Sequence, residues 1–471
     1  MNYQWIIDQI PDYEVFMTVD ELDASSRQLA NEYPDIVELR EIGKSRNGHP
    51  ILCLVIGRGS QNALLFASPH PNEPMGCMMI EYFSKLLAEN DELREELDYT
   101  WYFIKCIDCD GTRLNEGWFK GPFTLTHFWR DYYRPADYEQ VEWTFPLNYK
   151  NYSFNDPLPE TQALMKMIDE TKPLFMYSLH NTTFGGTYWY LSQELEAVWD
   201  RLYKANQRQG LPLHLEEPEE NQLTPYAPAI FPMIDQGEIY EFYETYSDVP
   251  PESLMLGGDS SFSYAAKYGT TLLVTELPNF YDPRIADLSE LPFSRRKAMR
   301  RNQELYWEIL EQADELYRVI EPYLSGDNPF ANTVEINVRN YRKQYELELR
   351  HIDENPIYDE PCTVAEGFDS LEIRKLDRLF YLTLLRRSCE HELQKADHPG
   401  YELLLRVHAE VANAFEAAAA VIESEFNYTV IPIRKLVSVQ LESGLVLADY
   451  LMREKRDHAR KKDDLKVRSA V

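Results

Sequence analysis

The sequence has few cysteines, no long apolar run and no excess of basic residues. Its 471 residues include only 6 cysteines, which is too few for the disulfide framework of a secreted protein. Cys106 and Cys109 form one C-x-x-C pair without a second pair at zinc-site spacing, so we expect buried thiols. No apolar run reaches the roughly 18–20 residues of a membrane span, and MNYQWIIDQIPDYEV lacks the pattern of a signal peptide. We therefore expect a cytoplasmic protein that does not bind membranes.

The charge balance is strongly acidic. There are 47 lysines and arginines against 79 aspartates and glutamates, which gives a formal net charge of −32 at pH 7. Such a surface repels the phosphates of nucleic acids. We therefore predict no nucleic-acid partner and interpret the acidity as a solubility feature. A chain of this length, with 44% hydrophobic residues, has enough apolar material for the cores of two domains.

The first 325 residues alternate between predicted strands and helices. Two strands within 35–57 flank Asn47-Gly48, a typical hairpin turn. Further strands are expected near residues 63–67, 100–107, 173–179 and 269–275, with helices near 19–33, 76–89, 159–170 and 294–320. This alternation predicts an α/β fold: a mixed, mostly parallel twisted sheet with helices on both faces.

The character of the chain changes near residue 327. Four later segments have helical spacing, at residues 341–350, 370–389, 401–425 and 436–452. We therefore predict a catalytic domain at 1–326, a helical domain at 327–455, and a flexible charged tail at 456–471. The helical domain would pack on the catalytic domain or on a second subunit in a homo-oligomer. A lid or a partner-binding surface is the alternative.

Three of the predicted strands end in ionisable side chains. The run 63–67 leads to His70 and Glu73, the run 173–179 leads to His180, and the run 269–275 leads to Glu276. Because active sites of open α/β sheets lie at the carboxyl ends of the strands, we expect these four side chains to gather on one rim.

Two imidazoles and two carboxylates are the groups that a hydrolytic zinc site needs. Catalytic zinc takes three protein ligands and leaves one position for water. We therefore predict one zinc ion per chain, held by His70, Glu73 and His180. Glu276 would be the base that activates the zinc water as nucleophile.

Over residues of about 15–325 the sequence resembles the zinc metallocarboxypeptidases, the carboxypeptidase A-like family. Six segments in the family's order carry the resemblance: YPDIVELREIGKSRNGHPI, ASPHPNEPMG, DCDGTRLN, PLPETQALMKMID, SLHNTTFGG and VTELP. The resemblance implies that His70, Glu73 and His180 hold zinc and that Glu276 activates water. It also implies that Arg113, in DCDGTRLN, polarises the scissile carbonyl and stabilises the oxyanion.

The sequence departs from the family where the substrate's terminal carboxylate is bound. The family usually has Asn-Arg there, whereas PLNYKN places Asn148 beside Tyr149. We expect Asn148 and Tyr149 in the substrate site. Among Arg130, Arg134 and Lys150, we expect Arg134 to replace the missing arginine.

These observations predict a zinc-dependent enzyme that hydrolyses an amide bond. The first hypothesis is a metallocarboxypeptidase acting on a small or modified peptide. The alternative keeps the site but changes the substrate, giving an N-acyl amino acid deacylase or an amidase for γ-glutamyl or cell-wall peptides. A non-catalytic binding protein on the same fold is a third hypothesis, which the complete set of site residues disfavours.

Overall fold

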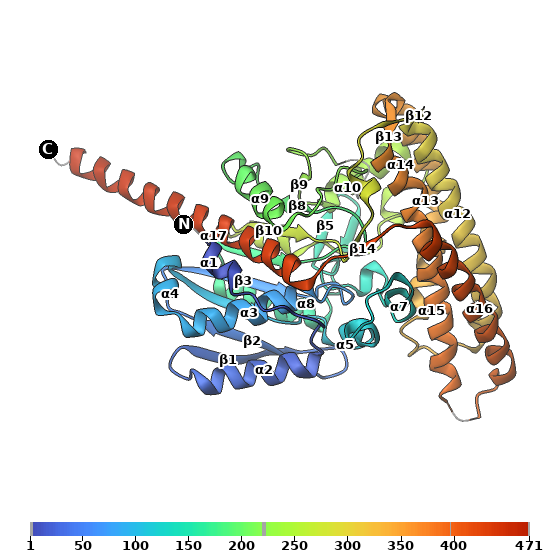
Figure 1. Cartoon of the computed structure of the whole chain (residues 1–471), viewed down its shortest axis with the longest axis horizontal. Coiled ribbons are helices and arrows are strands. Elements are labelled where there is room, and N and C mark those ends of the chain that lie inside the picture. Colours follow the sequence, from blue (N-terminus) through green and yellow to red (C-terminus); the bar gives the residue numbers. More distant parts are fainter. Residues whose placement is uncertain (1–2, 219–222, 396, 470–471) are drawn as a thin grey trace.

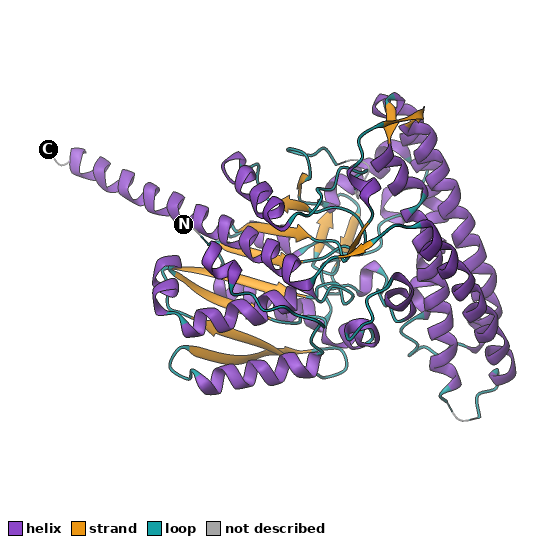
Figure 2. Cartoon of the chain, viewed as in Figure 1, coloured by secondary structure: helices purple, strands orange, loops and turns teal. Residues whose placement is uncertain are grey.

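A twisted sheet and a layer of long helices make up the structure, a computed structural model that describes residues 3–218, 223–395 and 397–469 (Figures 1 and 2). The main sheet has eight strands in the order β1-β2-β4-β3-β7-β10-β8-β9. These strands are β1 (Val37–Lys44), β2 (Pro50–Ile56), β3 (Gln61–Ala67), β4 (Tyr99–Ile104), β7 (Phe175–Leu179), β8 (Tyr188–Leu191), β9 (Ile230–Pro232) and β10 (Thr271–Glu276).

The sheet is mixed, and its centre is parallel. Strands β4, β3, β7 and β10 run parallel to one another, while β1, β2 and β8 join antiparallel neighbours. The central strands are almost wholly buried, as expected for parallel strands covered on both faces. Three antiparallel pairs lie outside this sheet: β5 (Leu147–Tyr149) with β6 (Tyr152–Phe154), β11 (Phe280–Tyr281) with β14 (Thr429–Val430), and β12 (Glu290–Ser294) with β13 (Pro361–Thr363).

Helices cover both faces of the sheet. One face carries α2 (Val19–Glu32), α3 (Met75–Glu89) and α17 (Ile433–Ser469), with α9 (Glu196–Gln209) packed against α17. The other face carries α8 (Pro159–Thr171), against which α11 (Ser261–Ala266) packs. The shorter helices of this part are α1 (Gln4–Asp8), α4 (Asp91–Leu97), α5 (Cys109–Arg113), α6 (Glu116–Phe119), α7 (Leu125–Arg130), η1 (Asp137–Glu139), α10 (Gln236–Tyr246), η2 (Pro251–Ser253) and η3 (Pro283–Ala286). The predicted fold class is therefore confirmed.

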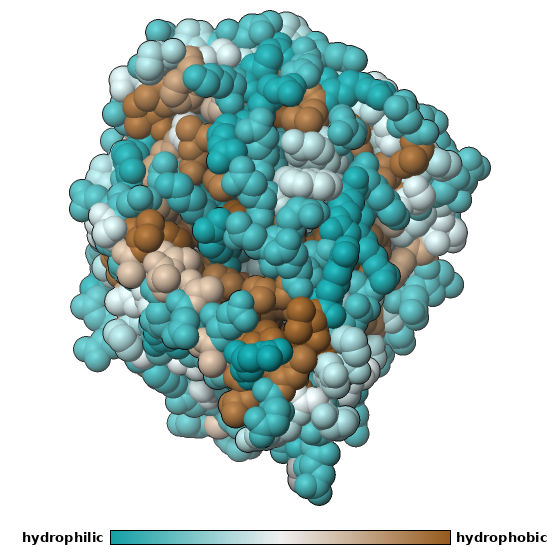
Figure 3. Space-filling model, turned by 90° about the vertical axis from the view of Figure 1, so that its right-hand side faces the viewer, coloured by the Kyte–Doolittle hydropathy of each residue, from teal (hydrophilic) through white to brown (hydrophobic). Residues whose placement is uncertain are grey.

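The helical region, residues 295–425, forms the second layer. Its elements are α12 (Arg295–Ile320), η4 (Glu321–Tyr323), α13 (Ala331–Glu354), η5 (Pro356–Asp359), α14 (Val364–Leu371), η6 (Ile373–Lys375), α15 (Leu376–Leu393) and α16 (Tyr401–Glu425). Figure 3 looks onto this region and shows a mostly hydrophilic face with apolar patches. The exposed large apolar side chains of α16 are Tyr401, Leu405 and Val421.

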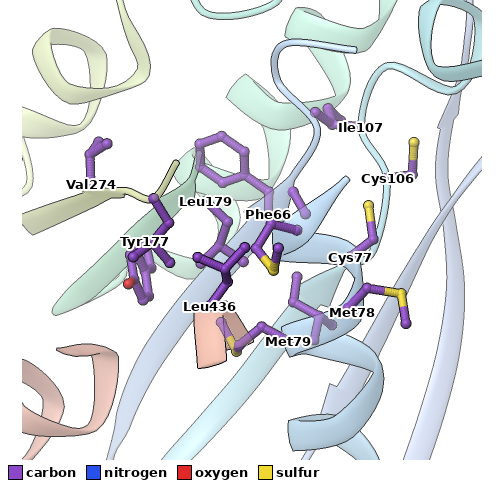
Figure 4. Packing of buried hydrophobic residues seen from close by; sticks show 14 of the residues in the cluster. Phe66, Cys77, Met78, Met79, Cys106, Ile107, Tyr177, Leu179, Val274 and Leu436 are labelled. Atoms are coloured by element: carbon purple, nitrogen blue, oxygen red, sulfur yellow. The ribbon is translucent and has the colours of Figure 1, made fainter. Parts of the chain in front are cut away.

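The structure divides differently from the boundaries expected at residues 326 and 455. Helix α12, expected in the catalytic domain, packs against α13, α14 and α15 of the helical region. Helix α17 returns to the sheet and packs on α3, α9, β7 and β10. In Figure 4, Leu436 of α17 lies among side chains of the sheet and of α3. One continuous apolar cluster joins both layers, because their facing surfaces are apolar.

The tail expected to be flexible from residue 456 belongs to α17, which is helical to Ser469 and projects from the body (Figure 1). No Gly or Pro interrupts this segment, and Arg453 pairs with Asp449 one turn earlier, which supports the helix. All six cysteines are free and buried, as predicted. Within the described residues, no helix combines the length and the apolar character that crossing a bilayer requires.

Candidate metal centre and cavity

The loop that follows β3 turns sharply and presents two side chains to one point. Ser68 adopts a left-handed conformation with φ of 51°, and its hydroxyl donates to the carbonyl of Glu73 at 3.3 Å. The amide of Glu73 donates to the carbonyl of His70 at 3.1 Å, which closes the turn. At Gly76, in the first turn of α3, a Cβ would lie 2.4 Å from Cβ of Leu179. This close approach fixes the loop against the end of β7.

His70, Glu73 and His180 form the one group among the described residues whose geometry could hold a metal ion. Nδ1 of His70 lies 3.1 Å from Oε1 of Glu73, and Nδ1 of His180 lies 2.9 Å from Oε2 of the same carboxylate. Their potential ligand atoms lie within 4.8 Å of one another, and all three side chains are buried. Nδ1 of His180 forms no aligned hydrogen bond in this structure. Two imidazoles and a carboxylate that converge in this way fit the zinc ion that the sequence predicts.

The pKa values of His70, Glu73 and His180 are shifted by burial and by neighbouring charges. Burial and the neighbouring Arg134 lower the pKa of His70 to about 4, so its ring is neutral at pH 7. Burial raises the pKa of Glu73, but both imidazoles outweigh burial and hold the pKa well below its usual range. Burial lowers the pKa of His180, but the surrounding carboxylates outweigh burial and raise it well above its usual value. A metal ion would displace the proton of His180.

A second set of contacts positions His180 from behind. Nε2 of His180 lies 2.8 Å from the hydroxyl of Ser178, which donates to Glu142 at 2.6 Å. The side-chain amide of Gln440, in α17, donates to the carbonyl of His180 at 2.9 Å. Ring orientation in metal sites depends on such outer contacts. Glu142 and Gln440 therefore belong to the site, although no sequence motif marks them.

Glu276 lies beside this cluster, as the order of the strands predicts. It is the last residue of β10, and its Oε1 lies 3.6 Å from Nδ1 of His180. Strands β3, β7 and β10 are adjacent and parallel, so the residues at their carboxyl ends meet at one edge. Glu276 is 7% exposed, and its carboxylate faces the same cavity as the cluster.

Of the two arginines that the sequence places in the site, Arg134 lies at the metal centre and Arg113 does not. The guanidinium of Arg134 donates to Oε1 of Glu73 at 3.0 Å and lies 3.0 Å from Nδ1 of His70. Arg113 lies outside the cavity lining and instead pairs with Asp20 of α2 at 2.6 Å. The short helix α5 turns Arg113 toward α2, so the structure corrects the placement of Arg113 in the site.

Asn148 and Tyr149 also lie elsewhere. Both belong to the β5–β6 hairpin, and neither lines the cavity. Asn148 is exposed and accepts a hydrogen bond from Ser153 at 2.7 Å. The hydroxyl of Tyr149 donates to Glu241 at 2.6 Å. The hairpin packs on α10 rather than on the metal centre, and these two predictions are therefore corrected as well.

Behind the site, a buried ion cluster joins the β1–β2 turn to α8. The guanidinium of Arg46 lies 3.3 Å from Asp108 and 3.3 Å from Glu160. Both carboxylate side chains are wholly buried. Burial raises the pKa of Asp108 to about 7. The guanidinium of Arg46 lowers this pKa, but it also pairs with Glu160, whose negative charge raises the pKa of Asp108 further.

The metal centre opens into a cavity of about 550 Å³. The part of the chain before the helical region contributes Arg134, Asp137, Glu142 and Tyr243, among others. The helical region contributes Asn340, Gln344 and Glu348. Sequence reasoning missed these last three because nothing in the helical pattern of α13 indicates which face meets a cavity.

One comparison with known proteins covers the part of the chain that carries His70, Glu73 and His180. The sequence model described as zinc carboxypeptidase matches residues 22–222, which confirms the resemblance over that part of the chain. A search of curated proteins found no match.

The solved structures that this chain matches include metallocarboxypeptidases. Carboxypeptidase A from Helicoverpa armigera is 14% identical, with 56% of this chain and 65% of that chain covered and a TM-score of 0.37. A metallo-carboxypeptidase from Burkholderia cenocepacia is 14% identical, with coverages of 56% and 60% and a TM-score of 0.29. The murein-tripeptide amidase MpaA from Escherichia coli O157 is 13% identical, with coverages of 52% and 88% and a TM-score of 0.26. The chain thus spans less than two thirds of the first two proteins.

Proposed function

We propose that this chain, whose residues 22–222 match the zinc carboxypeptidase family, is a zinc-dependent hydrolase that cleaves an amide bond. One observation carries the proposal: the ligand atoms of His70, Glu73 and His180 lie within 4.8 Å of one another, beside a further carboxylate at the end of the next strand. These groups suffice to bind zinc and to move a proton next to it.

The residues divide the chemical work. His70, Glu73 and His180 would hold zinc, which when bound acidifies a water molecule and polarises a carbonyl group. Glu276 lies 3.6 Å from Nδ1 of His180, within reach of the same point. Its carboxylate would accept the proton of the attacking water and deliver it to the leaving nitrogen.

Arg134 takes the role that the resemblance assigned to Arg113. Its guanidinium lies 3.0 Å from both Glu73 and His70, at the edge of the site where a substrate carbonyl would enter. A fixed positive charge with planar donors stabilises the oxyanion that forms when water attacks an amide. In this role Arg134 would stabilise the transition state and would not bind a carboxylate of the substrate.

The reaction proposed first is the release of a C-terminal residue from a small or modified peptide. Deacylation of an N-acyl amino acid and cleavage of a γ-glutamyl or cell-wall peptide amide use the same groups. These reactions differ in whether the substrate presents a free carboxylate beside the scissile bond. A panel of matched amides with and without that carboxylate would separate them.

Metal analysis and one substitution test the proposal. The purified protein should contain about one zinc ion per chain. Glu276→Gln should retain zinc and lose about 10²–10⁴-fold in kcat for any amide that the wild type hydrolyses, because the general base is gone. Glu290→Gln, an exposed residue of β12, is the matched control and should retain full activity. A zinc-free wild type, or full activity in Glu276→Gln, would refute the assignment.

A further inference from the structure

Helix α13 forms one wall of the cavity that contains the metal centre. Asn340, Gln344 and Glu348 all line this cavity, and their spacing of four residues places them on one face of the helix. Helix α13 begins more than 100 residues after the segment that matches the zinc carboxypeptidase family. The wall is therefore an element that the family match does not include.

Contacts with the catalytic part fix the position of this wall. The hydroxyl of Thr333 donates to the carbonyl of Arg134 at 3.3 Å, which links the start of α13 to the loop of the site arginine. About three turns farther along the helix, the side-chain amide of Gln344 donates to the hydroxyl of Tyr243 at 2.6 Å. Leu347 is buried in an apolar cluster with Phe242 and Leu254. The three residues of the wall therefore face the cavity from a fixed position.

The described lining of the cavity is rich in carboxylates and poor in cations. Its single lysine or arginine is Arg134, whose guanidinium contacts Glu73 and His70. The lining carboxylates are Glu73, Asp137, Glu142, Glu276 and Glu348. A substrate carboxylate bound away from Arg134 would meet like charges, whereas a cationic group would meet opposite ones.

Asn340 adds a polar group that lacks a partner. Its side chain is 8% exposed, and Oδ1 makes no hydrogen bond with any described residue. An unpaired buried acceptor is costly, and a ligand with N–H donors would satisfy it. A donor N–H of a substrate would suit Asn340. An ammonium group, which carries three donors and a positive charge, would suit Glu348, which lies about 12 Å farther along the helix.

We propose that Asn340, Gln344 and Glu348 of α13 are specificity-determining residues that bind an ammonium-bearing part of the substrate. The amide that is cleaved then belongs to a compound that carries an ammonium group on the side facing α13. This inference rests on the proposed function, because it describes the substrate of the same site.

Three matched ligands test the inference by binding. N-(5-aminopentyl)benzamide, N-pentylbenzamide and 6-benzamidohexanoic acid share a benzamide and differ in a terminal ammonium, methyl or carboxylate group. Calorimetric titration into the zinc-loaded Glu276→Gln protein measures affinity without turnover. The amine should bind at least tenfold more tightly than the neutral amide, and the acid should bind more weakly than both. Equal affinities, or no binding of the amine, would overturn the inference.

Two further variants locate the effect on α13. Glu348→Gln in the Glu276→Gln background should remove most of the preference for the amine. Glu346→Gln changes an exposed residue of the same helix and should keep the preference. Thermal melting checks that both variants fold. If Glu348→Gln does not fold, Asn340→Ala on the same helix gives a second test. A preference that survives Glu348→Gln and Asn340→Ala contradicts the role of the wall.

Failure of this inference differs from failure of the proposed function. If zinc-loaded wild type hydrolyses amides but the three ligands bind equally, only the assignment of the wall is wrong. If the wild type hydrolyses none of the three amides although the amine binds tightly, the cavity recognises cations and the proposed reaction is wrong.

Discussion

Helix α17 supports the metal centre through one hydrogen bond that can be removed selectively. Gln440 is wholly buried and donates from its side chain to the carbonyl of His180 at 2.9 Å. Gln440→Leu keeps a similar volume and leaves that carbonyl without its donor. A buried unpaired acceptor costs about 1–3 kcal/mol. The substitution also removes Oε1 of Gln440, which is buried without a partner among the described residues. The free energy of unfolding should therefore fall by less than about 3 kcal/mol.

The same substitution should weaken zinc binding. The substitution removes the hydrogen bond from α17 to the carbonyl of His180. Loss of an outer contact of a metal ligand typically lowers metal affinity about 10–100-fold. We expect the lower end of that range, because Ser178 still contacts the ring of His180 at 2.8 Å. Competition with a fluorescent zinc chelator measures the affinity, and urea unfolding of the metal-free protein measures the stability.

Leu436→Ala is the matched control on the same helix. Leu436 is 1% exposed, and Figure 4 shows it among apolar side chains of the sheet and α3. Its truncation should cost about 2–5 kcal/mol while leaving the contacts of His180 intact. If Gln440→Leu leaves zinc affinity unchanged, or if Leu436→Ala weakens zinc binding equally, the contact does not act through His180.

Three further predictions follow from local geometry. Arg134→Ala should lower kcat about 10²–10³-fold in a steady-state assay, whereas Arg113→Ala should leave kcat unchanged; the reverse order would restore Arg113 to the site. Because the folded protein raises the pKa of Asp108 from 3.8 to about 7, it holds a proton that the unfolded chain releases, so the free energy of unfolding falls as pH rises through this window. Asp108→Asn should remove that slope, which is worth up to about 4 kcal/mol over the whole window. Urea unfolding at pH 5 and pH 8 measures how much the free energy of unfolding changes in each protein. The same change in wild type and in Asp108→Asn would contradict the reasoning. Gly76→Val places side-chain atoms where Leu179 and Ala67 already lie and should cost at least about 1–3 kcal/mol; an unchanged melting temperature would contradict the close approach.

The core of the site could be predicted because it depends on strand order alone. In a parallel sheet the carboxyl ends of adjacent strands meet at one edge. The residues at the end of β10 and just after β3 and β7 could therefore be placed without knowledge of the loops. The apolar runs that mark these strands are unambiguous, since both faces of each strand are covered. His70, Glu73, His180 and Glu276 therefore come together by topology.

The residues carried by loops could not be placed in this way. Between residues 112 and 160 the path of the chain depends on packing with the helical region, as where Trp129 and Tyr132 contact Phe380 of α15. Sequence spacing does not record such contacts. The resemblance placed Arg113 in the site, although it faces α2. Arg134, which was expected to bind a substrate carboxylate, follows α7 and lies at the metal centre.

The apolar face of α17 shows why a boundary near residue 326 does not separate the catalytic part from the rest. Tyr177 of β7 donates to the carbonyl of Gln440 at 2.9 Å, and a Cβ at Gly444 would lie 2.8 Å from the ring of Tyr177. Without α17, the buried side chains of β7 and β10 on this face would be exposed to water. Helix α13 supplies a wall of the cavity, and α17 supplies part of the core beneath the metal centre. The reaction proposed for the metal centre therefore depends on Glu276 and on two helices that lie outside the family match.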